Sequence, residues 1–93
     1  MFISASVREI CYEAFRGCKQ LRNVHFAAGS QMEKIGVRAF AGSGLERFAL
    51  PPSTLSLGSL AFFGCKNLKT VDFNQGLMEI GPLCFLGSNV QNL

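Results

Sequence analysis

The chain has no tryptophan, only one tyrosine and one histidine, and charged residues at just 16% of its 93 positions. It also has no apolar run near the roughly 18 residues that a membrane-spanning helix needs. No membrane insertion is therefore expected. Residues 1–9 lack both a basic start and a sustained apolar stretch, so they are not expected to be a signal peptide, and the cellular location stays unknown.

The sequence also lacks the residue patterns that carry chemistry. No glycine-rich phosphate loop, pair of carboxylates or Ser-His-Asp set occurs at a plausible spacing. No two cysteines form the C-x₂-C pair that many zinc sites use. We therefore predict a protein that is not an enzyme and that needs no metal or cofactor.

What the sequence does contain is a short phrase, Ala-Phe-x-Gly-Cys/Ser, which occurs four times, once with Cys in place of Ala. Its phenylalanines are 25, 22 and 23 residues apart, at Phe15, Phe40, Phe62 and Phe85. A period of this length indicates a solenoid of small stacked units rather than one globular core. The flanking positions repeat as well, giving the unit I-G-x-x-A-F-x-G-C/S-x-x-L-x-x-V-x-F. About four copies account for the chain.

Each part of this unit predicts a local structure. Alternating apolar and polar residues at its end predict parallel strands near 22–26, 46–50, 69–73 and 91–93. The Ala-Phe phrase is too short for a stable α-helix, so a single helical or 3₁₀ turn is expected there. The aliphatic residues upstream are expected to form a second row of short extended segments. Stacked units would align the four phenylalanines in a core column, and this role is favoured over a ligand-binding aromatic box.

The repeated unit resembles the BspA-type leucine-rich repeats, which read approximately L-x-x-I-G-x-x-A-F-x-x-C-x-x-L-x-x-V-x-I-P. Residues 77–85 and 61–73 match this pattern closely, and the resemblance covers essentially the entire chain. It implies an α/β repeat solenoid, a right-handed leucine-rich-repeat coil with a parallel β-sheet on its concave face and short helical or 3₁₀ turns on the other side. Residues 1–93 would form a single solenoid of about four repeats, cut in mid-repeat at both ends.

The same resemblance implies a part of a surface or secreted protein that works in adhesion or other protein contacts. The sequence departs from the family pattern at Ser43 and Ser88, which replace Cys, and at Cys84, which replaces Ala. The loop at residues 27–31 is also longer than its counterparts. None of these departures threatens the fold, but they leave the ligand open.

The four cysteines are expected to be free thiols. Cys18 and Cys65 hold equivalent places two repeats apart, so they would be about 10 Å from each other, beyond the roughly 7 Å limit between Cα atoms in a disulfide. Cys84 lies in the Ala position of the last unit, out of register with Cys65. Cys11 follows an aliphatic core position and is expected to be the most reachable thiol.

Solenoids commonly bind partners on the concave face of their sheet. The outward residues there include our candidate ligand-binding set: Asn23, His25, Arg47, Thr70 and Asp72. Two alternatives stay open for this mixed polar surface: it binds a peptide or a glycan, or it is only solvated. A Cys-His catalytic pair would need a thiol on the same face, and Cys18 is expected in the core.

The residues on either side of Ala-Phe differ between repeats. They are polar or small in the first two units, but the last two place Leu60, Phe63, Leu83 and Leu86 together. Exposed apolar clusters generally mark contacts. Three alternatives stay open for this cluster: a protein or self-association interface, cover by a neighbouring segment, and local burial.

The net charge of +3 and the isoelectric point near 8.9 give only a weak indication of the partner. Lys19, Arg22, Lys66 and Lys69 gather before the predicted strands, but the second and fourth repeats interrupt the line. A solvated polar flank is favoured over an anion site, and nucleic acid is disfavoured as a partner. Two functions remain: a non-catalytic interaction or adhesion module for a protein or glycan, and a structural unit that forms homo-oligomers or end-to-end stacks.

Overall fold

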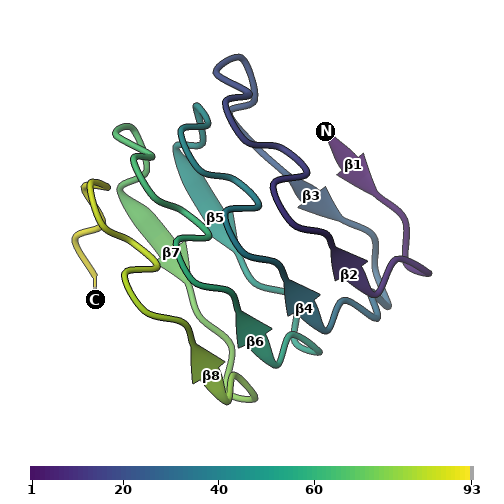
Figure 1. Ribbon diagram of the computed structural model, residues 1–93. Coiled ribbons are helices and arrows are strands. Elements are labelled where there is room, and N and C mark those ends of the chain that lie inside the picture. The colour runs from purple at the N-terminus through teal and green to yellow at the C-terminus, as the bar shows by residue number, and fades with distance from the viewer. Residues whose placement is uncertain (93) are drawn as a thin grey trace.

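The computed structural model describes residues 1–92, and these form short parallel strands in two rows (Figure 1). The first row contains β1 (Phe2–Ile3), β3 (His25–Phe26), β5 (Arg47–Ala49) and β7 (Thr70–Asp72). The second row contains β2 (Glu9–Ile10), β4 (Lys34–Ile35), β6 (Ser56–Leu57) and β8 (Glu79–Ile80). The chain alternates between the rows, so the predicted second row of extended segments is confirmed.

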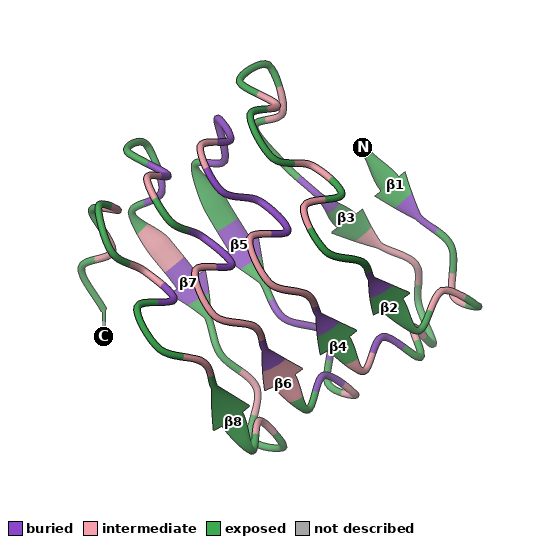
Figure 2. Ribbon diagram, viewed as in Figure 1, coloured by how far each residue is buried: buried purple, intermediate pink, exposed green. Residues whose placement is uncertain are grey.

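The second row is a continuous parallel sheet with the order β2-β4-β6-β8. Its register aligns the aliphatic residue of each unit, pairing Ile10 with Ile35, Ile35 with Leu57 and Leu57 with Ile80. In the inner strands these side chains are buried (Figure 2). Each repeat of the sequence therefore forms one coil of the structure.

The first row is broken, which corrects the expectation of one sheet. β1 pairs with β3 and β5 pairs with β7, but no strand pairing joins β3 to β5. The coils still touch there, because Glu46 N–H donates to Arg22 O at 3.0 Å. Further along the strand the hydrogen bonds between β3 and β5 cannot continue. Leu50 N–H donates to Asp72 O in β7, so the backbone nitrogen of the next residue, Pro51, points toward β3. Proline has no N–H to donate there.

The Ala-Phe segments are successions of tight turns, and no helix or 3₁₀ helix is formed there within residues 1–92, so the expected helical turns are not confirmed. The N–H groups of Glu13, Phe15 and Gly17 donate to carbonyls of the next coil, and those between them donate to carbonyls three residues back. The next coil repeats the pattern. A helix would use every one of these donors within its own coil, and stacking competes for half of them. No helix of residues 1–92 could span a membrane.

The predicted strand at 91–93 lies partly outside the described residues, which exclude Leu93. Gln91 and Asn92 are not in a strand. Instead, the Asn92 side chain takes the place of a strand at the free edge of β7. Its Nδ2 donates to Val71 O at 2.7 Å and its Oδ1 accepts from Val71 N at 3.2 Å. One amide side chain thus satisfies the backbone groups of Val71.

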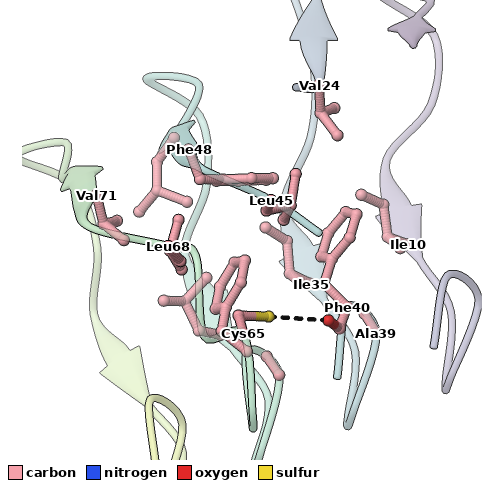
Figure 3. Packing of buried hydrophobic residues seen from close by; sticks show 14 of the residues in the cluster. Ile10, Val24, Ile35, Ala39, Phe40, Leu45, Phe48, Cys65, Leu68 and Val71 are labelled. Atoms are coloured by element: carbon pink, nitrogen blue, oxygen red, sulfur yellow. Dashed lines mark hydrogen bonds between the residues drawn. The ribbon is translucent and has the colours of Figure 1, made fainter. Parts of the chain in front are cut away.

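The predicted column of phenylalanines is confirmed. Successive rings of Phe15, Phe40, Phe62 and Phe85 stack at 5.4, 5.6 and 5.4 Å between centroids, within 13° of parallel. Phe48 packs against both central rings (Figure 3). Cys65 lies in the same core, where its Sγ donates to Phe40 O at 3.0 Å. The four phenylalanines of the column and Phe48 therefore serve as packing residues. The right-handed sense of the coil and its concave curvature stay predictions.

Candidate interaction surfaces

The outer face of the first strand row, here called the sheet face, carries Asn23, His25, Arg47, Thr70 and Asp72. All are exposed except Thr70, which is half-buried. The structure brings two of them together: Arg47 Nε donates to Asp72 Oδ2 at 3.4 Å across the β5-β7 pair. Arg22 pairs with Glu46 in the same way at 2.9 Å. Exposed pairs like these add little stability, but they neutralise the face.

His25 lies apart from that pair, because β3 and β5 are not joined. It lines a hollow of about 480 Å³ between the loop that follows β3 and the segment Ala49–Pro52. Asn23 accepts a hydrogen bond from the amino terminus of Met1 at 3.3 Å through its carbonyl. The sheet face is therefore not a single cluster of ligand-binding groups.

A second surface follows the second-row strand of each coil and includes the Ala-Phe phrase. It is here called the turn edge, and it consists of residues 11–19, 36–44, 58–66 and 81–89. It carries the apolar patch formed by Leu60, Phe63, Leu83 and Leu86. Hydrogen bonds between coils fix their neighbours: Leu60 N–H donates to Pro82 O, and Gly64 N–H donates to Leu86 O. Leu60 therefore lies beside Leu83, and Phe63 beside Leu86.

These apolar side chains are open to solvent. The exposed fractions are 42% for Phe63, 61% for Leu83 and 50% for Leu86, and Leu60 is half-buried. Local packing thus buries only Leu60 in part. Leu60 and Leu83 also have a left-handed backbone, with φ of 58° at each. Glycine adopts this conformation without strain. For other residues the conformation costs about 1 kcal/mol or more.

The same left-handed position is occupied by Glu13 and Arg38 in the first two coils. Every coil therefore has a residue other than glycine at a position whose left-handed backbone favours glycine. In the first coil it makes an ion pair, because Arg16 Nη1 lies 2.6 Å from Glu13 Oε2. In the last two coils it exposes apolar surface.

The net charge of the protein is concentrated on this turn edge. Four of the nine basic residues lie there, Arg16, Lys19, Arg38 and Lys66, with one of the six acidic residues, Glu13. Five residues of each sign remain elsewhere, so the rest of the chain is neutral. We did not foresee this from the sequence. Counting charges by their place in the repeat would have found it.

Two adjoining hollows lie on the turn edge, and one of them is lined by both basic residues and Phe63 of the apolar patch. One, of about 420 Å³, lies between Lys19 and Lys66 over a floor that includes Gly42, Gly44 and Gly64. The other, of about 240 Å³, is lined by Arg38, Lys19 and Phe63 among others. Lys19 and Gly42 belong to both hollows. Basic groups and the aromatic ring therefore face a common space.

The four cysteines are free thiols, and Cys18, which was expected in the core, is half-buried. Cys11 is exposed, as expected, whereas Cys65 and Cys84 are buried. Burial raises the pKa of both buried thiols, and hydrogen bonds from Ser43 partly offset the effect at Cys65. Raised values suppress the thiolate form that nucleophilic catalysis requires. Within residues 1–92 no group of three or more His, Cys, Asp or Glu side chains is placed to hold a metal ion.

Alkaline pH is expected to destabilise the fold through Cys84. Burial raises its pKa from 9.0 to about 11. Between these values the unfolded chain loses a proton that the native protein keeps, so the free energy of unfolding falls as pH rises, by about 2 to 3 kcal/mol in total. Urea unfolding at several pH values measures this. Cys84→Ala places the alanine of the other three coils there, and an unchanged alkaline loss in that variant would contradict the assignment.

Comparison with known proteins agrees with the repeated coil. The family model described as the BspA type leucine rich repeat region, of six copies, matches residues 1–93. The chain belongs to this family. Among solved structures, the crystal structure of the pneumococcal vaccine antigen PcpA is similar, with a TM-score of 0.81 and 27% sequence identity. The match covers 94% of this chain and 27% of the PcpA chain, so the BspA-type chain spans about a quarter of that structure's length. No curated protein matches it.

Proposed function

We propose that this chain is a non-catalytic protein-interaction module of a surface protein, and that its partner contacts the apolar patch. The observation that carries the proposal is the exposure of Phe63, Leu83 and Leu86 on adjoining coils. Water contact with clustered apolar side chains is unfavourable, and such clusters generally mark contact sites. The left-handed backbone at Leu60 and Leu83 adds support, since glycine there would remove both strain and apolar exposure.

The comparisons support the broader part of this proposal. Members of repeat families build stacked units into extended surfaces that bind partners. The similar structure is named as a vaccine antigen, which suits a protein exposed on a cell surface. An adhesive role for this chain rests on that likeness. The sheet face is proposed as a second contact region for a protein or glycan, with Asn23, His25, Arg47, Thr70 and Asp72 as its residues.

Leu83→Gly is expected to separate binding from stability. It relieves the left-handed strain, so the free energy of unfolding should stay the same or rise by up to about 1 kcal/mol. Peptides selected from a random display library on the wild-type protein should bind this variant about tenfold more weakly, because an exposed anchor is lost. Titration by fluorescence anisotropy measures both affinities.

Arg47→Ala tests the second proposed contact region, because it changes an exposed residue of the sheet face. The matched control is Lys34→Ala, at an exposed residue outside both proposed contact regions. It should leave the affinity for the same peptides within about twofold, as expected for a side chain outside the contact. If Arg47→Ala weakens binding and Leu83→Gly does not, the contact lies on the sheet face and the patch proposal fails.

A second candidate function is self-assembly through the same patch. End-to-end stacking in the register of the coils is less favoured than pairing through the patch. Gly36 and Gly58 lie where the preceding coil approaches, and a Cβ on Gly58 would be 2.6 Å from backbone atoms of Gly36 and Val37. Cys11 holds this position in the first coil, so a copy stacked on it would meet the Cys11 side chain.

Light scattering over a range of concentrations tests self-assembly. A patch dimer should double the mass of 10.1 kDa at high concentration, and the double substitution of Phe63 and Leu86 by Ser should abolish the increase. Monomeric mass in both proteins would remove the self-assembly function and leave the interaction module.

A further inference from the structure

We propose that the turn edge binds an acidic, amphipathic protein segment. Its carboxylates would lie over Lys19, Arg38 and Lys66, and its apolar side chains would cover Leu60, Phe63, Leu83 and Leu86. This inference rests on the proposed function, because it takes the apolar patch as the contact surface and adds the chemistry of what covers it.

The first argument is charge complementarity. The whole net charge of +3 lies on the turn edge, and the remainder of the chain has as many acidic as basic residues. Two of the five basic residues elsewhere form ion pairs, Arg22 with Glu46 and Arg47 with Asp72. The turn edge therefore presents the field that attracts a negatively charged partner.

The second argument is that three of these four basic groups form no ion pair with an acidic side chain of residues 1–92. Arg16 is paired with Glu13 at 2.6 Å. Among residues 1–92, Lys19, Arg38 and Lys66 form no ion pair. A carboxylate from a partner would meet these groups without first displacing an internal one. The pairing would be charge-assisted and partly shielded from water by the hollows.

The third argument is the shape of the surface between the two kinds of residue. Lys19 and Lys66 line a hollow of about 420 Å³ together with Ser43, Asn67 and three glycines, which present no side chains. Lys19 also lines the adjoining hollow of about 240 Å³ beside Arg38 and Phe63. A peptide backbone can approach these glycines closely. Acidic side chains would then reach the lysines while neighbouring apolar side chains lie over Phe63 and the leucines.

These features favour a protein segment over other acidic macromolecules. A nucleic acid or sulfated glycan would leave the four apolar residues uncovered, and nucleic-acid sites use longer basic stripes. Lipid recognition typically uses clusters of about four to eight basic residues, and in the described part of the chain the turn edge has three that form no ion pair. The hollows are also concave, whereas a membrane surface is contacted best by protruding groups.

Peptide selection with charge-reversed variants tests the inference. Peptides enriched on the wild-type protein should contain more Asp and Glu than Lys and Arg, together with aromatic or aliphatic residues. The double variant Lys19→Glu with Lys66→Glu should bind them at least about tenfold more weakly at low salt. The matched control, Arg8→Glu with Lys34→Glu, makes the same change in net charge away from the turn edge and should change the affinity by less than about twofold.

Each result decides the inference. Acidic, apolar peptides that lose affinity only in the turn-edge variant support it. The inference is overturned if the enriched peptides contain no acidic residues, or if both double variants lose the same peptide affinity. In either case the proposed function still stands if Leu83→Gly weakens peptide binding. Peptides that fail to distinguish wild type from Leu83→Gly overturn the proposed function itself. A lipid partner would show as sedimentation of the wild-type protein with vesicles of about 30% phosphatidylserine. If the turn-edge variant does not sediment and no peptide binds, the surface contacts lipid and the inference is overturned.

Discussion

Phe62→Ala is expected to lower the free energy of unfolding by about 4 kcal/mol, whereas Phe63→Ala, one residue later, should lower it by less than about 1 kcal/mol. Phe62 is fully buried, and Phe63 is 42% exposed. The Phe62 ring stacks on Phe40 at 5.6 Å and on Phe85 at 5.4 Å, and Phe48 packs against it at 5.1 Å. Removing it leaves a cavity between two coils that cannot collapse without shifting their backbones.

The size of this effect matters because the protein is small. A domain of this length is typically stable by about 5 to 14 kcal/mol, so the change would remove a large part of the total. Urea unfolding followed by far-ultraviolet circular dichroism measures it, since no tryptophan is present. Similar losses in the two variants would contradict the assignment of Phe62 to the column and of Phe63 to the surface.

The sequence was sufficient to predict the stacked coil because its strongest constraints repeat. Phe15, Phe40, Phe62 and Phe85 share a spacing that only stacking explains, and the structure stacks them. The aliphatic residue before each phrase predicted the second row in the same way. Identical environments in successive coils select similar residues, so the pattern reports the environment directly.

The features that the structure does not confirm depend on competition for backbone hydrogen bonds. The Ala-Phe segments were expected to be helical, but Phe15 N–H and its alternate neighbours donate to the next coil. Nothing in one unit shows which donors its neighbour will claim. The break between β3 and β5 has a similar origin, because it arises where Pro51 of one coil meets the loop after β3 of another.

For the proposed interaction surfaces, the repeat predicts the positions of the residues but not how they combine. The places of Leu60, Phe63, Leu83 and Leu86 beside the Ala-Phe phrase follow from the repeat. Their link to Lys19 and Lys66 does not, because the two hollows combine residues from three coils. The ion pair of Arg47 with Asp72 also does not follow from the repeat. The β5-β7 register places Arg47 opposite Thr70, and the pair runs diagonally to Asp72.

Gly58→Ala is expected to destabilise the coil by about 3 kcal/mol, the upper part of the range for overpacking. A Cβ at this position would lie 2.6 Å from Gly36 C and 2.6 Å from Val37 N, which are backbone atoms and cannot rotate away. The coils would have to separate where Gly58 N–H donates to Ile35 O at 2.7 Å and Arg38 N–H donates to Ser59 O at 3.1 Å. This contact explains why glycine follows the aliphatic residue in three of the four units.

Two other glycines make the test specific to close approach. Gly29→Ala has open space around the new Cβ but a φ of 77°, so strain alone should lower the free energy of unfolding by about 1 kcal/mol. At Gly76 the new Cβ would meet only Pro52 O at 3.6 Å, an ordinary contact, and the change should be within about 0.5 kcal/mol. Urea unfolding of the three variants should therefore rank Gly58 first, Gly29 second and Gly76 last. If Gly58→Ala instead resembled Gly76→Ala, the coils would have to be further apart than their hydrogen bonds allow.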